Sequence, residues 1–352
     1  MSLHETIDRG KGCRERFGSG NKREHRGTIV PTPGVFDAII DYMDISALIV
    51  ADGECPDIHL TVSSVFELAR EVIIIDIGLN PQTKQKIKTD YPLTRFYWLD
   101  KPEYVELIRQ QTLEFTLHPW VLLLDPDEYL APDLVRYLKE FDPAVVAEHT
   151  HFRIPRQNYI FGKWIAHSRW WPDYQVRLFQ KDSIEWPPKL HAQPVLKGKG
   201  YIIPAFENEK LEMNARTIVH HNYTSIMQYL EKNVRYARVE AQGIIDSDVE
   251  FGIMDATRKA TSEFISRFFA DKGYKDGMHG FVLALLQSFY SMLVFLDVWE
   301  KRGYPEASQT AVLRGADQFF VKTSKEIFYW LQRDRLAKGR DALVSRIRSK
   351  LL

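Results

Sequence analysis

The chain has 352 residues, enough for about two domains of ordinary size. It carries 47 basic and 47 acidic side chains, so its formal charge is 0, which argues against a protein built mainly to hold nucleic acid. Its 45% hydrophobic and 27% charged residues exclude wholesale disorder. The two cysteines, Cys13 and Cys55, are too few for a disulfide framework or a cysteine zinc site, and they fit a reducing, cytoplasmic compartment.

Three regions of the chain differ in their pattern of polar and apolar side chains. Residues 1–30 are polar, contain a basic run at 22–26 and have no apolar stretch typical of a secretory signal, so we expect a flexible leader. Short apolar runs alternate with helical stretches over 31–223, which predicts an α/β domain. Helical periodicity dominates over 224–352 and predicts a helical C-terminal region.

The α/β region predicts a mainly parallel sheet flanked by helices. Strands are expected where short runs of aliphatic or large apolar side chains occur, at 46–51, 71–75, 95–98 and 120–124. Helical spacing is found at 56–68, 83–89, 104–115 and 132–141. Strands that alternate with helices form βαβ units with parallel neighbours. From 149 to 223, aromatic residues, arginines and prolines crowd together and suit strands and loops folded over the edge of the sheet.

One stretch near the C-terminus, residues 277–296, carries no formally charged side chain. Three interpretations remain open: a buried core or dimer helix, a helix lying at a membrane surface, or a membrane-spanning helix. Basic residues dominate the tail at 333–350, which favours contact with anionic lipid. We therefore expect a cytoplasmic protein with peripheral contact at the inner face of the membrane.

Aspartates follow three of the predicted strands: Asp52, Asp76 and Asp125. The carboxyl ends of parallel strands meet at one edge of a sheet, where ligands bind, so these side chains predict a site. In the segment WVLLLDPDEY at 120–129, Asp127 follows Asp125 at i+2. Carboxylates so placed suit Mg²⁺ or Mn²⁺, with positions left open for phosphate oxygens, and the ion would offset the charge on a departing diphosphate. Alternatively, Asp127 or Asp133 caps the helix at 132–141 and Asp125 only ends a strand.

The order and spacing of the motifs resemble the family 2 glycosyltransferases of GT-A fold, especially the branch of lipopolysaccharide-core glucosyltransferases. The resemblance runs from about residue 46 to 300 and rests on 75–78 (IDIG), 124–130 (LDPDEYL), 156–159 (RQNY), 170–179 (WWPDYQVRLF), 190–191 (LH), 219–223 (VHHNY), Lys232 with Tyr236, and 275–277 (KDG). It implies a GT-A (Rossmann-like) fold and an inverting enzyme. Such an enzyme moves a hexose from a nucleotide-diphosphate sugar to a glycan or lipid-linked acceptor of the cell-envelope polysaccharide type.

The resemblance also implies provisional roles for individual residues. The nucleotide-sugar side is assigned to Asp52, Asp76, Gly78, Asp125 and Arg177. The metal ligands are expected to be Asp127, Asp125 and His220, and the acceptor side is expected to contain Trp170, Trp171 and His191. Large aromatic residues such as these tryptophans are more often part of the core, and an isolated histidine is more often structural. His220 and the adjacent His221 also precede a predicted helix, where either would cap it.

Inversion requires a base that takes the proton of the acceptor hydroxyl. Asp173 is the predicted base, because it follows a Trp-Trp-Pro segment whose apolar rings would raise its pKa. The alternative is that Asp173 pairs with Arg177 at i+4 and that each only neutralises the other.

Two departures from the family pattern keep other functions open. The family's His-Glu pair is His191-Ala192 in this chain, and Leu79 and Asn80 replace the serine and aspartate expected after Gly78. These changes fit a catalytically silent relative that only binds a nucleotide or glycan. A phosphatase with Asp125 as nucleophile is a third reading. Against it, buried strands precede the motif and position 129 is Tyr129. No nucleic-acid partner is predicted.

Overall fold

The computed structural model describes residues 43–188, 193–206 and 215–339, with 341–342 and 344–345. The predicted leader at 1–30 and the predicted acceptor residue His191 lie outside the described residues.

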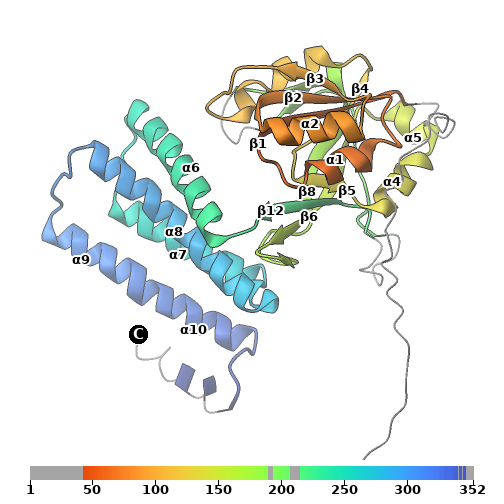
Figure 1. Ribbon diagram of the computed structural model, residues 1–352. Helices are drawn as coiled ribbons and strands as arrows, with labels where there is room; N and C mark the ends of the chain where they lie inside the picture. Colours follow the sequence, from red (N-terminus) through yellow and green to blue (C-terminus); the bar gives the residue numbers. More distant parts are fainter. Residues whose placement is uncertain (1–42, 189–192, 207–214, 340, 343, 346–352) are drawn as a thin grey trace, which may run out of the picture. The chain divides into compact units, whose positions relative to one another are not determined.

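One mixed sheet organises the α/β region (Figure 1). Its strands are β1 (Ile45–Gly53), β2 (Glu71–Leu79), β3 (Arg95–Trp98), β4 (Trp120–Leu124), β5 (Glu128–Leu130), β6 (His151–Ile160), β7 (Lys163–Trp164), β8 (Asp173–Gln180), β11 (Gly200–Ile202) and β12 (Ile218–Tyr223). The order is β3-β2-β1-β4-β8-β6-β12-β5, with β7 and β11 paired to β6. The first four strands are parallel, β12 is parallel to β6, and β8 is antiparallel to both its neighbours. Strands β9 (Ile184–Glu185) and β10 (Val195–Leu196) form a separate pair.

Helices and turns connect these strands. The elements of the sheet region are α1 (Ile58–Val65), α2 (Pro81–Asp90), η1 (Val105–Leu107), α3 (Arg109–Thr112), η2 (Leu113–Phe115), α4 (Pro132–Lys139), α5 (Pro143–Glu148) and η3 (Lys181–Ser183). The helix predicted over 104–115 is thus a succession of three short turns. The strands at 46–51, 71–75, 95–98 and 120–124 and the predicted fold class, a mainly parallel sheet flanked by helices, are confirmed.

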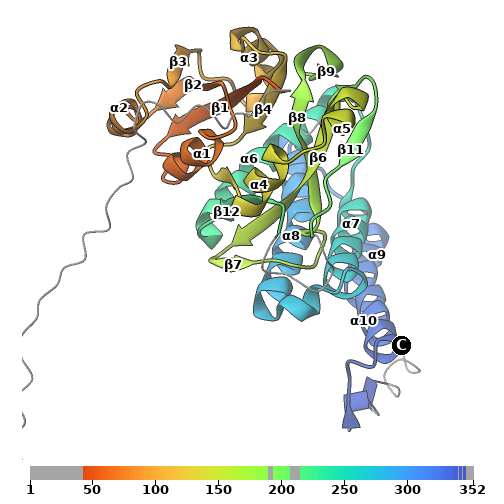
Figure 2. The same ribbon diagram turned by 90° about the vertical axis from the view of Figure 1, so that its right-hand side faces the viewer.

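The C-terminal region is helical, as predicted. It contains α6 (Ile226–Asp246), α7 (Ile253–Ile265), η4 (Ser266–Ala270), η5 (Gly273–Asp276), α8 (Met278–Lys301), α9 (Gln309–Asp317), η6 (Gln318–Lys322) and α10 (Thr323–Arg333). Helix α8 packs against α6 and α7, and the three lie side by side in Figures 1 and 2. Small side chains, among them Ala237 and Ala241 of α6, meet Val294 and Val298 of α8 in this interface.

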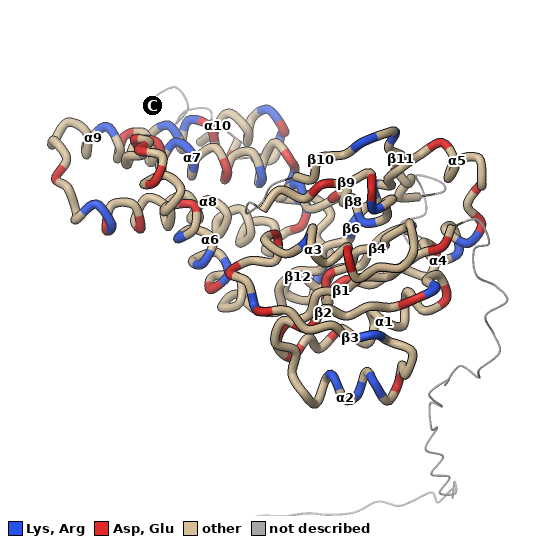
Figure 3. The backbone as a smooth tube through the Cα atoms, turned by 90° about the horizontal axis from the view of Figure 1, so that it is seen from above, with Lys and Arg blue, Asp and Glu red and all other residues tan. Residues whose placement is uncertain are grey.

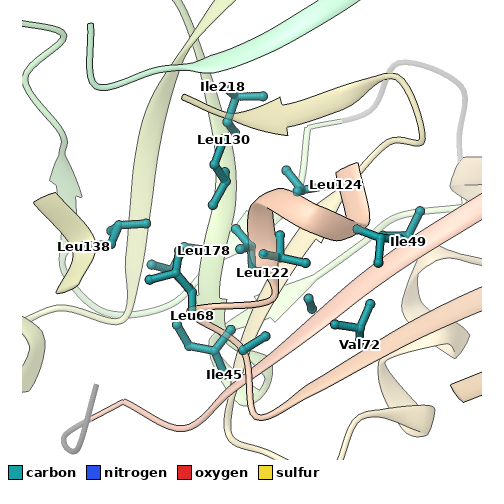
Figure 4. Packing of buried hydrophobic residues seen from close by; sticks show 14 of the residues in the cluster. Ile45, Ile49, Leu68, Val72, Leu122, Leu124, Leu130, Leu138, Leu178 and Ile218 are labelled. Atoms are coloured by element: carbon teal, nitrogen blue, oxygen red, sulfur yellow. The ribbon is translucent and has the colours of Figure 1, made fainter. Parts of the chain in front are cut away.

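The alternating side chains of the central strands form two apolar layers. Ile45 and Ile49 of β1 point to the layer under α1, whereas Leu48 and Val50 point to the opposite layer. Figure 4 shows the first layer, in which side chains from β1, β2, β4, β5, β8 and β12 meet Leu138 of α4. Burial of each such aliphatic side chain stabilises the fold by roughly 1.5–3 kcal/mol, so the strand ends that carry the polar residues stand on a rigid support.

Acidic and basic residues are interspersed in both the sheet region and the helical region, in keeping with the formal charge of 0 (Figure 3). Helix α8 is the described helix that is long and apolar enough to cross a membrane by length and composition, and 33% of its most apolar stretch is buried. One face packs on α6 and α7, which agrees with the core interpretation for that face, while Leu285 (51% exposed) and Phe289 (46% exposed) lie outside the packing.

A buried aspartate connects the helical region to the sheet. The carboxylate of Asp276 accepts hydrogen bonds from the backbone N–H groups of Ala166 (3.3 Å) and His167 (2.9 Å) and contacts Nδ1 of His167 at 3.0 Å. Close packing beside it requires glycine at position 280, because a Cβ there would lie 1.8 Å from the carbonyl oxygen of Gly273. The 275–277 segment noted in the sequence therefore has a structural role at this junction.

Candidate functional site

A cavity of about 780 Å³ lies where β1, β4 and β8 meet β12 and α6. Six residues singled out from the sequence line it: Asp52, Asp125, Asp127, Trp170, Arg177 and His220. Four others are described but do not line it: Asp76, Gly78, Trp171 and Asp173. Its volume is in the range of small-molecule sites.

The turn that carries Asp125 and Asp127 is held from three sides. Residues 125–127 connect β4 to β5, and β5 pairs with β12 in antiparallel register. The backbone N–H of His221 donates to the carbonyl oxygen of Asp127 at 3.0 Å, and Oγ1 of Thr61 in α1 donates to the carbonyl oxygen of Pro126 at 3.1 Å. These bonds fix the backbone of the turn from which both carboxylates extend.

Glu128 lies directly under this turn and is fully buried, with 0% exposure. Its Oε2 accepts the backbone N–H of Asp125 at 3.0 Å. Its Oε1 accepts from Nη1 of Arg156 and from Nη2 of Arg177, both at 2.7 Å. A buried carboxylate is costly unless it is paired and hydrogen-bonded, and here two guanidinium groups supply the pairing.

The carboxylate of Asp125 faces arginines. Nη2 of Arg177 contacts Oδ2 at 2.5 Å, and Nη2 of Arg109 lies 3.6 Å from Oδ1. Burial by itself would raise the pKa of Asp125, but the guanidinium charges of Arg177, Arg109 and Arg156 hold that pKa far below its ordinary value. Asp125 is therefore ionised, and both of its oxygens already face a cation.

Asp173 does not pair with Arg177. Both residues lie on β8, so positions i and i+4 are about 13 Å apart along an extended strand. Oδ2 of Asp173 instead accepts from Nε and Nη2 of Arg156 (2.8 and 2.6 Å), and Oδ1 accepts from Nε2 of Gln175 at 2.6 Å. The expectation of a raised pKa is wrong: burial favours a higher pKa, but Arg156 and the hydrogen bonds from Asn158, Arg156 and Gln175 lower it. The role of Asp173 as base stays a prediction.

The side chain of Asn158 connects Asp173 to His220. Its amide nitrogen has two partners that only accept, the carbonyl oxygen of Trp170 (3.0 Å) and Oδ2 of Asp173 (3.1 Å). This fixes the amide orientation and turns Oδ1 toward Nδ1 of His220, 2.7 Å away. Nδ1 therefore donates, and in a neutral ring Nε2 carries the lone pair.

Nε2 of His220 lies 3.6 Å from Oδ2 of Asp127. When the imidazole is neutral, its Nε2 and the facing carboxylate are both acceptors, and a cation between them would satisfy both. A hydrogen bond like the one from His220 to Asn158 orients histidines that bind metals. Asp127 and His220 thus fit a divalent ion, whereas Asp125 faces arginines.

Among the described residues, no group of three or more His, Cys, Asp or Glu side chains could hold a metal ion. Protein ligands to such an ion would then be two, with the other positions left to water and phosphate oxygens. Mg²⁺ in nucleotide sites is commonly held in this way.

Two arginines in this region have unused donors. Nε of Arg109 and Nε of Arg177 are buried without a hydrogen-bond partner among the described residues, and both residues line the cavity. Unpaired buried donors of this kind are costly. The guanidinium of Arg109 also lies over the ring of Trp186, 4.9 Å from its centre.

Asp52 and Gly78 lie close together at the ends of β1 and β2. Oδ2 of Asp52 pairs with Nζ of Lys101 at 2.6 Å at the rim of the cavity. Gly78 has φ +131°, and a Cβ there would lie 2.8 Å from Oδ1 of Asp52, so only glycine allows this approach. Gly78 acts on the geometry of Asp52 and does not line the cavity.

Asp76 bonds within its own turn. Its carboxylate accepts the N–H groups of Gly78 (3.0 Å) and Leu79 (2.8 Å) and pairs with Nζ of Lys84 at 2.6 Å. Burial by itself would raise the pKa of Asp76. Lys84 and the two amides outweigh this effect and hold the pKa below its ordinary value. Asp76 lies within β2, and its carboxylate bonds to the end of that strand and to Lys84 of α2.

The two predicted acceptor-side tryptophans differ in position. Trp170 lines the cavity, whereas Trp171 packs edge-on against Trp164 with ring centres 5.5 Å apart. The alternative capping roles are not found. The N-cap of α4 is Ala131 and that of α6 is Ser225, whose Oγ accepts the N–H of Gln228 at 3.1 Å.

Several residues of this site have no role predicted from the sequence: Arg109, Glu128, Arg156, Asn158 and Lys232. All of them except Arg109 belong to the motifs named above, so the motifs marked the segments but not the contacts. No pattern along the chain indicates that β6 brings Arg156 and Asn158 beneath the turn at 125–127, because this depends on long-range strand pairing.

No family model matches the chain. Among solved structures, the chain is similar to the crystal structure of S. aureus TarS 1-349, with TM-score 0.34 and 12% sequence identity over 74% of this chain and 92% of that chain. A likeness at this level carries no argument about activity, so the function is argued from the site.

The lowered pKa of Asp173 predicts an acid-sensitive contribution to stability. A carboxyl whose folded pKa lies below its ordinary 3.8 stabilises the fold above about pH 4, and this stabilisation is lost as the pH falls through the folded value. Asp173→Asn is therefore expected to lower the free energy of unfolding by about 1–3 kcal/mol at pH 7 and by progressively less below pH 4. Urea denaturation across this range measures it. A difference that does not change with pH would contradict this assignment.

Proposed function

We propose that this protein is an inverting glycosyltransferase of family 2, which transfers a hexose from a nucleoside-diphosphate sugar to a glycan or lipid-linked acceptor with Mg²⁺ or Mn²⁺. One observation carries the proposal. Within a single cavity, the pair Asp127 and His220 lies beside the cations Arg177 and Arg109, whose Nε atoms have no hydrogen-bond partner in the described part of the chain. The motifs that resemble the lipopolysaccharide-core branch support the family, and the branch itself stays a prediction.

The site suits a ligand that is anionic and also carries a cation. Asp127 and His220 would hold the divalent ion, which when bound offsets the negative charge that grows on a departing diphosphate. Arg177 and Arg109 offer donors to phosphate oxygens, and Arg177 keeps its orientation because Glu128 holds it. Asp52 lies at the far rim, where the nucleoside would be recognised.

The chemical step needs a proton acceptor on the acceptor side. The acceptor oxygen forms the new bond to the sugar carbon, the bond to the diphosphate breaks with its electron pair on the leaving oxygen, and the proton goes to a base. Asp173 stays the residue predicted for that base from the sequence; in the structure it lies outside the cavity lining, and both of its oxygens are hydrogen-bonded. Trp170 lines the cavity, and its backbone carbonyl accepts a hydrogen bond from Asn158. Its ring offers an apolar face for a sugar.

The two alternatives differ in how the site would be used. A phosphatase needs Asp125 free to attack phosphorus, but its oxygens contact Arg177 and Arg109, which favours a positioning role. A catalytically silent relative would bind the nucleoside-diphosphate sugar without releasing the nucleoside diphosphate. Turnover of the donor separates that relative from a transferase.

The metal assignment predicts how nucleotides stabilise the protein. A panel of UDP, GDP, CDP and ADP with and without Mn²⁺ is expected to yield one nucleotide that raises Tm only when Mn²⁺ is present. Ligand at a hundred times Kd stabilises by about 2.7 kcal/mol. Asp127→Asn should abolish this shift, while the control Asp133→Asn, which loses only its contact with Arg136 on α4, should retain it.

An equal shift in Asp127→Asn and the wild-type protein would overturn the metal assignment. Incubation with the hexose conjugate of the bound nucleotide and Mn²⁺ then separates the functions. Release of the nucleoside diphosphate supports the transferase, and binding without release supports the silent relative.

We further propose that α8 contacts the inner face of the membrane. Met278, Leu285, Phe289 and Leu296 are exposed at spacings of seven, four and seven residues, which places them along one face of the helix. An apolar helix face of this kind binds at the boundary between lipid headgroups and acyl chains.

Replacing two of these side chains tests the contact. Leu285→Ser with Phe289→Ser is expected to reduce cosedimentation with phosphatidylglycerol-containing vesicles several-fold, because each apolar side chain adds about 1.5–3 kcal/mol when buried. Val312→Ser on α9, also exposed, is the control. Equal cosedimentation of all three proteins would contradict the proposal.

A further inference from the structure

Three cations that line the cavity, Arg153, Lys232 and Arg235, form no ion pair with an acidic side chain among the described residues. Arg177 pairs with Asp125 and Glu128, Arg109 lies near Asp125, and Lys101 pairs with Asp52. The ammonium group of Lys232, which lines the same cavity, forms no hydrogen bond or ion pair within the described part of the chain.

The position of Lys232 is fixed by the packing of α6. Strand β12, which carries His220, runs directly into α6, and Lys232 lies in the second turn of that helix. Lys232, Arg235 and Tyr236 occupy positions i, i+3 and i+4, so they share one face, and all three line the cavity. The opposite side of α6 packs on α8, which prevents the helix from turning away.

The ammonium group is held over an aromatic ring. Nζ of Lys232 lies 5.1 Å from the centre of the Tyr223 ring. Burial by itself lowers the pKa of Lys232, but Tyr223, Tyr236, Asp127 and Asp125 raise it above its ordinary value, so the group is charged. An anion bound in the cavity would give this charge a direct ion-pair partner.

We propose that Lys232 binds the diphosphate of the donor and stabilises the charge that the leaving oxygen acquires. This inference rests on the proposed function and adds a fixed cation from the helical region to the ion expected at Asp127 and His220. When the bond from the sugar carbon to the diphosphate oxygen breaks, the electron pair stays on that oxygen, and the ammonium group donates a hydrogen bond to the diphosphate. The C-terminal helices therefore complete the site.

The test uses inorganic pyrophosphate as the probe, titrated into the full-length protein in a calorimeter. Lys232→Met is expected to weaken pyrophosphate binding at least about tenfold, the loss typical of a hydrogen bond to a charged group. Lys232→Arg should restore part of it. Arg238→Met is the matched control, because Arg238 is an exposed cation of α6 that does not line the cavity, and its affinity should equal that of the wild-type protein. Thermal denaturation verifies that each variant is folded.

The outcomes separate this inference from the proposed function. Equal pyrophosphate affinity in Lys232→Met and the wild-type protein overturns the role of Lys232. If the Mn²⁺-dependent nucleotide shift is still lost in Asp127→Asn, the proposed function stands alone. A wild-type protein that binds neither pyrophosphate nor any of the four nucleoside diphosphates overturns both.

Discussion

The buried carboxylate of Glu128 holds Arg156 and Arg177 together, and the geometry of the cavity depends on that contact. From this centre, Arg177 reaches Asp125, and Arg156 reaches Asp173. A carboxylate with 0% exposure is tolerated only because two guanidinium groups and a backbone N–H satisfy it. Removal of one partner would leave an uncompensated buried charge.

The same chain of contacts orients the residues that face the ligand. Oδ2 of Asp173 accepts a hydrogen bond from the amide nitrogen of Asn158. The amide oxygen of Asn158 accepts from Nδ1 of His220 and so fixes the orientation of the ring, whose Nε2 faces Asp127. The buried contacts thus position side chains from β5, β6, β8 and β12 before any ligand binds. Preorganised charges of this kind stabilise a developing negative charge without reorganisation during the reaction.

Much of the fold was predictable from local patterns. The aliphatic runs at 46–51 and 120–124 are short and apolar on both faces, as buried parallel strands require, and the structure has strands there. The region from 104 to 115 was harder, because helical spacing does not distinguish one helix from the successive short turns that the structure has there.

The candidate site was predictable in outline. Aspartates at strand ends pointed to the edge of the sheet where the cavity lies, yet Asp76 bonds to the end of its own strand, and nothing local distinguishes it from Asp52. The pKa of Asp173 could not be inferred from the neighbouring tryptophans, because its partner Arg156 lies seventeen residues away on an adjacent strand. Long-range pairing decided which charges meet, and sequence patterns carry little information about it.

A double-mutant cycle of Glu128→Gln and Arg177→Met, measured as the free energy of unfolding, tests this account most directly. Each single change is expected to cost about 3–5 kcal/mol, because it leaves a buried charge without its partner. The double variant should be less destabilised than the sum of the two by at least about 1 kcal/mol. Additivity within about 0.5 kcal/mol would show that the two residues act independently and would contradict the central role of Glu128.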